Sequence, residues 1–135
     1  MEEPSTEHNI YPVKIGEIKS EVIHALSLSV SEGTPIYLGS SNIEHIINKH
    51  PSDYNKYGKY IGLIVNEPDF VGLNAKNQSI EYVKEFLIDG DFVKVAVRAS
   101  SIGKYFVRSL YTLNTERAIR FISKGTLKSL TKSHE

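Results

Sequence analysis

Two histidines lie five positions apart in the segment HIINKHP, residues 45–51. Histidine titrates near neutral pH, so a positioned histidine can act as a general acid or base. Zinc-binding helices space two histidines four positions apart, which places both rings on one face. On a helix of 3.6 residues per turn, a spacing of five turns the two rings about 140° apart. The sequence therefore predicts two separate histidines and argues against a metal ion shared between them.

The helical pattern gives the two histidines different surroundings. His45 shares a helix face with Lys49, and Asn42 lies one turn earlier on that face. His50 lies over an apolar stripe at the end of the helix. A histidine in such a place is commonly a buried core residue whose ring nitrogens are hydrogen-bonded. We therefore expect His45 to face away from the core and His50 to pack over the stripe, which consists of Ile43, Ile46 and Ile47.

A second group of polar residues lies in the C-terminal third of the chain. Basic and aromatic side chains are interleaved there, and such a surface can bind phosphates and stack nucleobases. Alternation along a strand predicts Tyr105, Ser109 and Tyr111 on one face, with Lys104 and Arg108 on the other. The simpler alternative is a solvated strand face with half-buried tyrosines. The residues that suggest nucleic-acid binding are Arg98, Lys104, Tyr105, Arg108, Ser109 and Tyr111.

The formal net charge of zero conceals two halves of opposite charge. Residues 1–91 contain seven Lys and Arg against fourteen Asp and Glu, a net charge of −7. Residues 92–132 contain nine Lys and Arg against Glu116 alone, a net charge of +8. A basic half suggests a polyanionic partner. Alternatively, the two halves pack together and neutralise each other.

Length and composition exclude several classes of protein. A chain of 135 residues with 40% hydrophobic residues fits one globular domain. The absence of cysteine excludes disulfides, thiolate metal sites and a cysteine nucleophile. We find no P-loop, dinucleotide-binding fingerprint or serine-triad motif, so we expect no cofactor. No apolar run reaches the ~20 residues of a membrane helix, and the acidic N-terminus is unlike a signal peptide. We expect a soluble cytoplasmic protein.

The period of the apolar residues predicts an α+β domain over residues 10–130, between a flexible arm at 1–9 and a flexible tail at 131–135. Residues 13–18 fit either a strand or the start of a helix. We expect helices at about residues 20–30, 40–50, 55–66 and 114–123, with short strands at 36–38 and 69–73. Three longer strands, residues 79–88, 92–99 and 104–113, predict an antiparallel meander, with Asp89-Gly90 at its first turn.

Five segments in this order resemble the phage-associated barnase–EndoU–colicin–RelE-like nuclease (PBECR) domains. They are HIINKHP (45–51), PDFVGLN (68–74), SIEYVKE (79–85), VKVAVRAS (93–100) and YFVRSLY (105–111). The resemblance extends from about Val13 to Leu130. It implies a barnase-like fold in which N-terminal helices precede a roughly four-stranded antiparallel meander and a short C-terminal helix. It also implies a ribonuclease site that needs no metal ion.

The resemblance assigns roles to individual residues. His45 and His50 match the paired histidines of the family, and Arg98 matches the basic residue that ends its VAVR strand. Ser109 and Tyr111 match the polar positions of the SLY strand. These five residues are the expected catalytic set. Lys49 matches a position that is usually basic, and the expected RNA-binding set is Lys49, Lys104, Tyr105 and Arg108.

The sequence and the resemblance together predict a metal-independent endoribonuclease that cleaves RNA through its 2′-hydroxyl. The expected setting is a toxin or phage-defence effector, with RNA as substrate, a cognate immunity or antitoxin protein as partner, and no membrane contact. The first alternative is a module of the same fold that binds RNA or protein without catalysis. The second is a structural component of a phage or mobile element.

Overall fold

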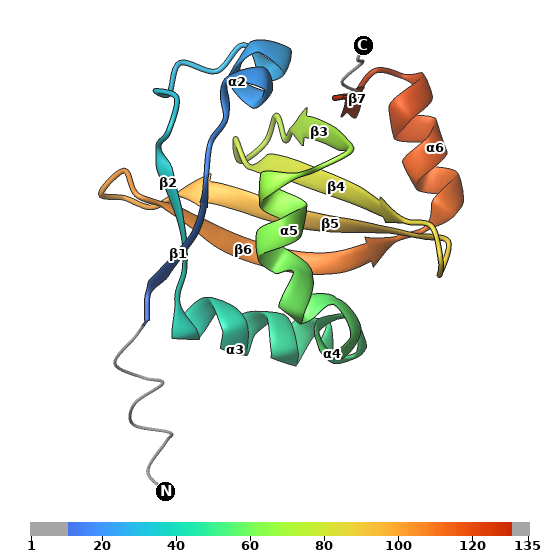
Figure 1. Cartoon of the computed structure of the whole chain (residues 1–135), viewed down its shortest axis with the longest axis horizontal. Coiled ribbons are helices and arrows are strands. Elements are labelled where there is room, and N and C mark those ends of the chain that lie inside the picture. The colour runs from blue at the N-terminus through green and yellow to red at the C-terminus, as the bar shows by residue number, and fades with distance from the viewer. Residues whose placement is uncertain (1–10, 131–135) are drawn as a thin grey trace, which may run out of the picture.

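The computed structural model describes residues 11–130, so the arm expected at residues 1–9 and the tail expected at 131–135 lie outside the described part. Figure 1 shows a twisted sheet with helices around it. The elements in chain order are β1 (Val13–Glu17), α2 (Ser20–Leu26), β2 (Pro35–Leu38), α3 (Ser40–Lys49), α4 (Pro51–Tyr57), the 3-10 helix η1 (Gly58–Tyr60), α5 (Ile61–Asn66), β3 (Phe70–Leu73), β4 (Ile80–Phe86), β5 (Asp91–Ala99), β6 (Tyr105–Leu113), α6 (Thr115–Ser123) and β7 (Lys128–Ser129).

The strands of the described residues form one seven-stranded sheet in the order β1-β2-β6-β5-β4-β3-β7. The expected meander is present, because β4, β5 and β6 pair antiparallel in sequence order. The prediction of a four-stranded sheet preceded by helices is wrong in detail. β1 and β2 pair with each other ahead of the long helices, and β2 joins β6 in parallel. A strand as short as β2 depends on packing against distant partners, which its own residues do not reveal.

The helices follow the predicted pattern with two changes. α2 is shorter than expected, and the helix expected at residues 55–66 is instead α4, η1 and α5 in succession. Pro51, which follows α3 after His50, begins α4, where the missing N–H of proline costs no helical hydrogen bond. Gly58 lies at the junction of α4 and η1, where a side chain would clash with Tyr54. A Cβ on Gly58 would lie 2.8 Å from Cε1 of the Tyr54 ring. No helix in residues 11–130 is long and apolar enough to span a membrane.

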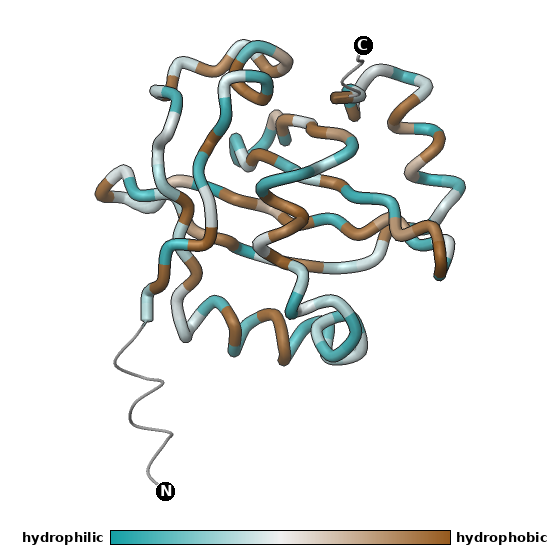
Figure 2. The backbone as a smooth tube through the Cα atoms, in the orientation of Figure 1, coloured by the Kyte–Doolittle hydropathy of each residue, from teal (hydrophilic) through white to brown (hydrophobic). Residues whose placement is uncertain are grey.

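The main hydrophobic core lies between one face of the sheet and helices that include α2 and α5. Val95, Val97 and Leu110 are fully buried there. We call the opposite face of the sheet the outer face. A smaller cluster packs against one end of this face, where Ala118 of α6 is buried with Phe92 and Leu113. Figure 2 shows apolar and polar positions alternating along the central strands, as expected for a sheet with two different faces.

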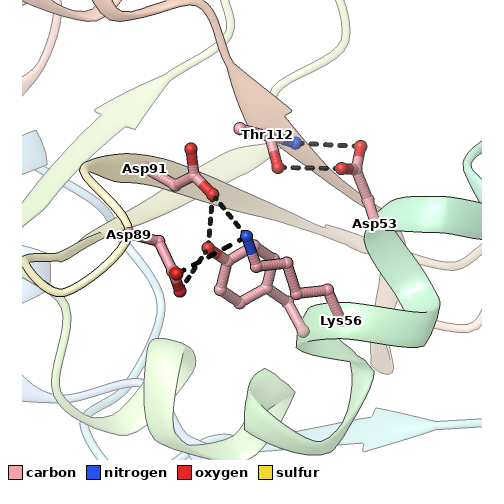
Figure 3. A network of polar contacts seen from close by, with 6 residues as sticks. Asp53, Lys56, Asp89, Asp91 and Thr112 are labelled. Carbon is pink, nitrogen blue, oxygen red and sulfur yellow. Dashed lines mark hydrogen bonds and ion pairs between the residues drawn. The ribbon is translucent and has the colours of Figure 1, made fainter.

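Helix α4 is fastened to the β4–β5 turn by a polar cluster (Figure 3). The Tyr57 hydroxyl donates a hydrogen bond to Asp91 and a longer one of 3.3 Å to Asp89. Lys56 Nζ lies 3.3 Å from the same Asp91 carboxylate. The Tyr57 side chain is almost fully buried. The hydrogen bond from Tyr57 is the main reason that the pKa of Asp91 lies below its ordinary value.

A second contact joins α4 to β6, as Figure 3 also shows. The Asp53 carboxylate accepts hydrogen bonds from the backbone N–H of Thr112 at 3.1 Å and from its hydroxyl at 2.8 Å. Because His50 directly precedes the first residue of α4, this contact fixes His50 relative to β6. The neighbour of Thr112 in that strand is Tyr111, which the next subsection places beside His50.

Replacing Tyr57 by phenylalanine should lower the free energy of unfolding by about 1.5–3 kcal/mol at pH 7, the range for a hydrogen bond to a charged group. Folding lowers the pKa of Asp91, so its carboxylate stabilises the fold fully at pH values above the pKa that Asp91 has in the unfolded chain. That stabilisation is lost as pH falls through the folded pKa. The difference between the two proteins should therefore shrink in acid. Urea unfolding at pH 7 and pH 3 measures both effects.

The matched control is Tyr82→Phe. Tyr82 is fully buried, and its hydroxyl has no hydrogen-bond partner among the described residues. Removing an unpaired buried hydroxyl costs nothing or slightly stabilises a protein. Equal destabilisation by the two substitutions would contradict the role assigned to the Tyr57 hydroxyl.

Candidate functional site

A polar hollow of about 550 Å³ lies where α3 meets β5 and β6. It gathers residues from distant parts of the chain, since α3 belongs to the acidic half and both strands belong to the basic half. Three residues of the predicted catalytic set and one of the predicted RNA-binding set line it: His45, Arg98, Ser109 and Arg108. Ser41 and Asn42, in the first turn of α3, complete the lining.

A β-bulge directs two neighbouring residues of β6 into this hollow. Ala96 of β5 pairs with Ser109, whereas the next residue, Val97, pairs with Val107, so Arg108 is an extra residue in β6. A bulge bends its strand and changes the direction of the side chains around it. Arg108 and Ser109, which strict alternation would place on opposite faces, therefore both line the hollow.

The same bulge overturns the predicted grouping of the tyrosines. Before the bulge, Tyr105 lies on the same side as Val107 and packs against the main core. After it, Ser109 and Tyr111 lie on the outer face, because their partners in β5 are Ala96 and Lys94. The expectation that Tyr105, Ser109 and Tyr111 share a face is wrong, because one inserted residue reverses the alternation between them.

Helix α3 presents its N-terminus and His45 to the hollow. Buried Ile46 anchors the helix to the main core, and His45, the preceding residue, is exposed. The Asn42 side chain accepts a hydrogen bond of 2.8 Å from the backbone N–H of Gly39. The first turn contains no acidic residue. The N–H groups of a first helical turn have no partners within the helix and carry partial positive charge, which favours anions.

A second group of contacts crosses the outer face beside the hollow. The rings of His50 and Tyr111 stack with centroids 5.0 Å apart and an angle of 24° between their planes. Lys94 Nζ lies 5.1 Å from the centre of the Tyr111 ring and 3.2 Å from the Glu81 carboxylate. Lys94 is 8% exposed, although it lies on the outer face. We call Glu81, Lys94, Tyr111 and His50 the stacked group.

The structure thus separates the two predicted histidines. His45 lies with the arginines, whereas His50 is half-buried against Tyr111 and is not among the residues lining the hollow. Helical spacing correctly indicated that the two rings are apart. The expected partner of His50 was the isoleucine stripe of α3, but the ring contact found is with β6, because the helix ends at Lys49 and the chain turns into α4.

The other predicted RNA-binding residues are dispersed. Lys49 is exposed at the end of α3, outside the lining of the hollow. Lys104 lies in the β5–β6 turn with its Nζ 5.4 Å from the Tyr37 ring centre. Among the residues of this set, Arg108 is the one that shares the hollow with His45.

Sequence reasoning missed Ser41 and the ion pair of Glu81 with Lys94, although a signal for the pair was present. Opposite charges in two strands joined by a short turn indicate a cross-strand contact. Glu81 and Lys94 lie in such a hairpin, at diagonal positions of the observed register. Within residues 11–130, no three His, Cys, Asp or Glu side chains are grouped to hold a metal ion.

The mixed sheet thus carries a cationic hollow that holds one histidine beside β5 and β6. A family model described as phage-Barnase-EndoU-ColicinE5/D-RelE like nuclease3 (PBECR3) matches residues 13–120. The chain belongs to this family of nuclease-like domains. Comparison with curated proteins and with solved structures gives no match.

Proposed function

We propose that this nuclease-family domain is an endoribonuclease that cleaves RNA through the 2′-hydroxyl without a metal ion. One observation carries the proposal: the hollow places His45 beside Arg98, Arg108 and Ser109. A proton-transfer group, two fixed positive charges and a hydroxyl donor are groups that assist cleavage of a phosphodiester by an internal nucleophile.

The chemistry assigns a role to each group. The RNA 2′-oxygen attacks the adjacent phosphorus, and the bond from phosphorus to the 5′-oxygen breaks. His45 transfers the proton at one of these two oxygens, and a water molecule exchanges the proton at the other. Arg98, Arg108 and the N-terminus of α3 stabilise the charge that develops on the phosphoryl oxygens. Ser109 donates a hydrogen bond to the same phosphate.

The stacked group gives His50 and Tyr111 a different role. His50 does not line the hollow, so we assign it to positioning Tyr111 rather than to proton transfer. Tyr111 lies two residues after Ser109 on the same face, roughly 7 Å along the strand. A tyrosine hydroxyl held there can form a hydrogen bond with a nucleotide whose phosphate occupies the hollow.

The charge of the hollow supports a reaction without a metal ion. The guanidinium groups of Arg98 and Arg108 line the same hollow, so they repel a divalent cation that enters it. They also supply the stabilisation of phosphoryl charge for which many nucleases use a metal ion. The proposal rests on these positive groups and on the separation of the two histidines.

Cleavage of total RNA in the presence of EDTA tests the proposal. Fragments should form as fast as without the chelator, and an RNA with a 2′-deoxy nucleotide at the cleaved position should stay intact. Zinc or magnesium restoring activity to an inactive, EDTA-treated sample would show that the reaction uses a metal ion. Cleavage of the 2′-deoxy substrate would exclude attack by the 2′-hydroxyl.

A second candidate, an RNA-binding module without turnover, is favoured by the same geometry. The reaction requires one proton removed and one delivered, and the hollow contains one histidine because His50 is stacked on Tyr111. Salt-sensitive binding of RNA that the protein leaves intact would select this candidate over the nuclease.

We further propose a toxin or phage-defence role in the cytoplasm, with an immunity or antitoxin protein as inhibitor. The family description names phage-associated nucleases, which supports this setting. An inhibitor of a cationic hollow should present acidic side chains to Arg98 and Arg108. Expression of the native chain should arrest bacterial growth, and expression of a His45→Ala chain should not.

RNA affinity should depend on position as well as on charge. Arg98→Ala should weaken RNA binding about tenfold and reduce the dependence of affinity on salt, because one phosphate contact and its released counterions are lost. The matched control is Arg120→Ala, which removes the same charge from an exposed site on α6. Fluorescence anisotropy between 50 and 200 mM salt measures both quantities. Equal losses in the two variants would mean that RNA binds through diffuse charge, not in the hollow.

A further inference from the structure

Two large apolar side chains are exposed at the tip of the β4–β5 turn. Leu87 is 80% exposed and Ile88 is 100% exposed, and Figure 2 shows this turn as an apolar tip at the right of the molecule. Apolar side chains that are exposed singly are ordinary, whereas contiguous apolar surface marks a site of interaction. Here the two side chains directly follow the half-buried ring of Phe86. We call Leu87 and Ile88 the apolar tip.

The backbone that carries the apolar tip is held in place on both sides. The N–H groups of Asp89 and Gly90 both donate to the carbonyl of Phe86, at 3.2 Å and 2.8 Å. The hydrogen bonds of Tyr57 to Asp89 and Asp91 fasten the same turn to α4. A surface that is already ordered loses less conformational entropy on binding. The apolar tip is therefore prepared for contact with another protein surface.

A pocket of about 370 Å³ opens directly beside the apolar tip. Three aromatic rings line it, and the Phe86 ring centre lies 4.8 Å from that of Tyr57 and 5.4 Å from that of Tyr60. Leu87 and Ile88 also belong to the lining. One surface thus presents a projecting aliphatic group and, next to it, an aromatic pocket in which such a group can be buried.

The rim of this aromatic pocket carries unpaired charges of both signs. Lys59 and Glu85 both line it, and neither forms an ion pair within residues 11–130. The other cation of the rim, Lys56, is already paired with Asp91 at 3.3 Å. The surface therefore offers one free cation and one free anion beside the apolar tip.

We infer that this surface binds a second copy of the chain in a two-fold symmetric dimer. Around a two-fold axis the same patch meets itself, so an interface of this kind must be complementary to itself. The apolar tip of each copy enters the aromatic pocket of the other copy, and Lys59 of each copy faces Glu85 of the other. The projecting group with its pocket, and the cation with the anion, supply that complementarity in shape and in charge.

The location and size of this surface determine what the dimer is like. The apolar tip and Arg98 lie at opposite ends of β5, so both hollows of the dimer remain open. The inference therefore does not depend on the proposed nuclease. A turn and one pocket form a small interface, and small interfaces are weak, so we expect a dissociation constant of roughly 10–100 µM.

Sedimentation equilibrium of the full chain, over a range of micromolar concentrations, tests the dimer. The native protein should change from monomer to dimer as its concentration rises. Ile88→Glu should weaken the dimer about tenfold or more, because the new carboxylate would be buried without a partner. Ile88 is fully exposed, so this variant keeps the folded monomer intact. The matched control is Ile102→Glu, since Ile102 is 76% exposed in the β5–β6 turn and lies outside the aromatic pocket.

Ile102→Glu should dimerise as the native protein does. A native chain that stays monomeric at every concentration overturns the inference, and so do equal losses in the Ile88 and Ile102 variants.

Exchange of the rim charges tests the two-fold arrangement. Lys59→Glu alone should weaken the dimer, because it places two carboxylates opposite each other, and Glu85→Lys alone should do so through two cations. The protein with both substitutions should regain the native dissociation constant, since each cation again faces an anion. Thermal melting of the three variants verifies that each is folded. A double variant that remains as weak as the single variants overturns the proposed arrangement.

Discussion

Replacing His45 by alanine should reduce RNA cleavage by about 10²–10⁴-fold, the usual contribution of a positioned proton-transfer group. The structure supports a large catalytic effect, because His45 faces Arg98 and Arg108 across the hollow. The free energy of unfolding should hardly change, since the side chain is exposed on α3. Initial cleavage rates on one RNA, together with thermal melting of both proteins, measure the two effects.

His24→Ala is the matched control, because it removes an exposed histidine from α2, at the far side of the molecule in Figure 1. That variant should cleave RNA at the native rate. His50→Ala should differ from both, since losing the ring stacked on Tyr111 should lower stability as well as activity. Full cleavage by the His45→Ala protein would remove proton transfer from α3 and leave the strand residues as the source of any activity.

Replacing Lys94 by alanine should lower the free energy of unfolding by about 3 kcal/mol, because breaking a buried ion pair leaves its partner charge uncompensated. The side chains of Lys94 and Glu81 are 10% and 13% exposed, and their charged atoms lie 3.2 Å apart. The Asn74 amide also donates to the Glu81 carboxylate, at 3.3 Å, but a neutral amide does not replace the charge of Lys94. Urea unfolding at neutral pH measures the change.

The control for Lys94 is a shorter but exposed ion pair. Lys14 lies 2.7 Å from Glu17, and the two side chains are 49% and 47% exposed. Exposed pairs contribute little, so Lys14→Ala should change stability by less than about 1 kcal/mol despite the better distance. If Lys14→Ala costs as much as Lys94→Ala, then burial does not determine the strength of the Lys94 pair.

Periodicity in the sequence was sufficient to place α3 and the β4–β6 meander. These elements are long enough for local residues to decide them: a buried isoleucine on α3 and alternating valines along β5. The positions of β1 and β2 within the sheet could not be predicted in the same way. Their place depends on the short parallel pairing of β2 with β6, Ile36 with Tyr105 and Tyr37 with Phe106, for which no local pattern exists.

The residues that line the hollow could be predicted from the sequence only in part. His45 could be separated from His50 by helical geometry, and Arg98 stood out as a basic residue in an apolar strand. The grouping of Arg108 with Ser109 depends on the β-bulge, and one extra residue in a strand leaves no mark in the hydrophobic pattern.

The place of β6 in the sheet determines when the proposed site can form during synthesis. Ribosomes release a chain from its N-terminus at roughly 5–20 residues per second, so His45 leaves the exit tunnel well ahead of Arg98 and Ser109. Strand β6 lies between β2 and β5, and the sheet cannot be joined until that strand is free. The residues of the proposed site therefore cannot come together until β6 has left the ribosome.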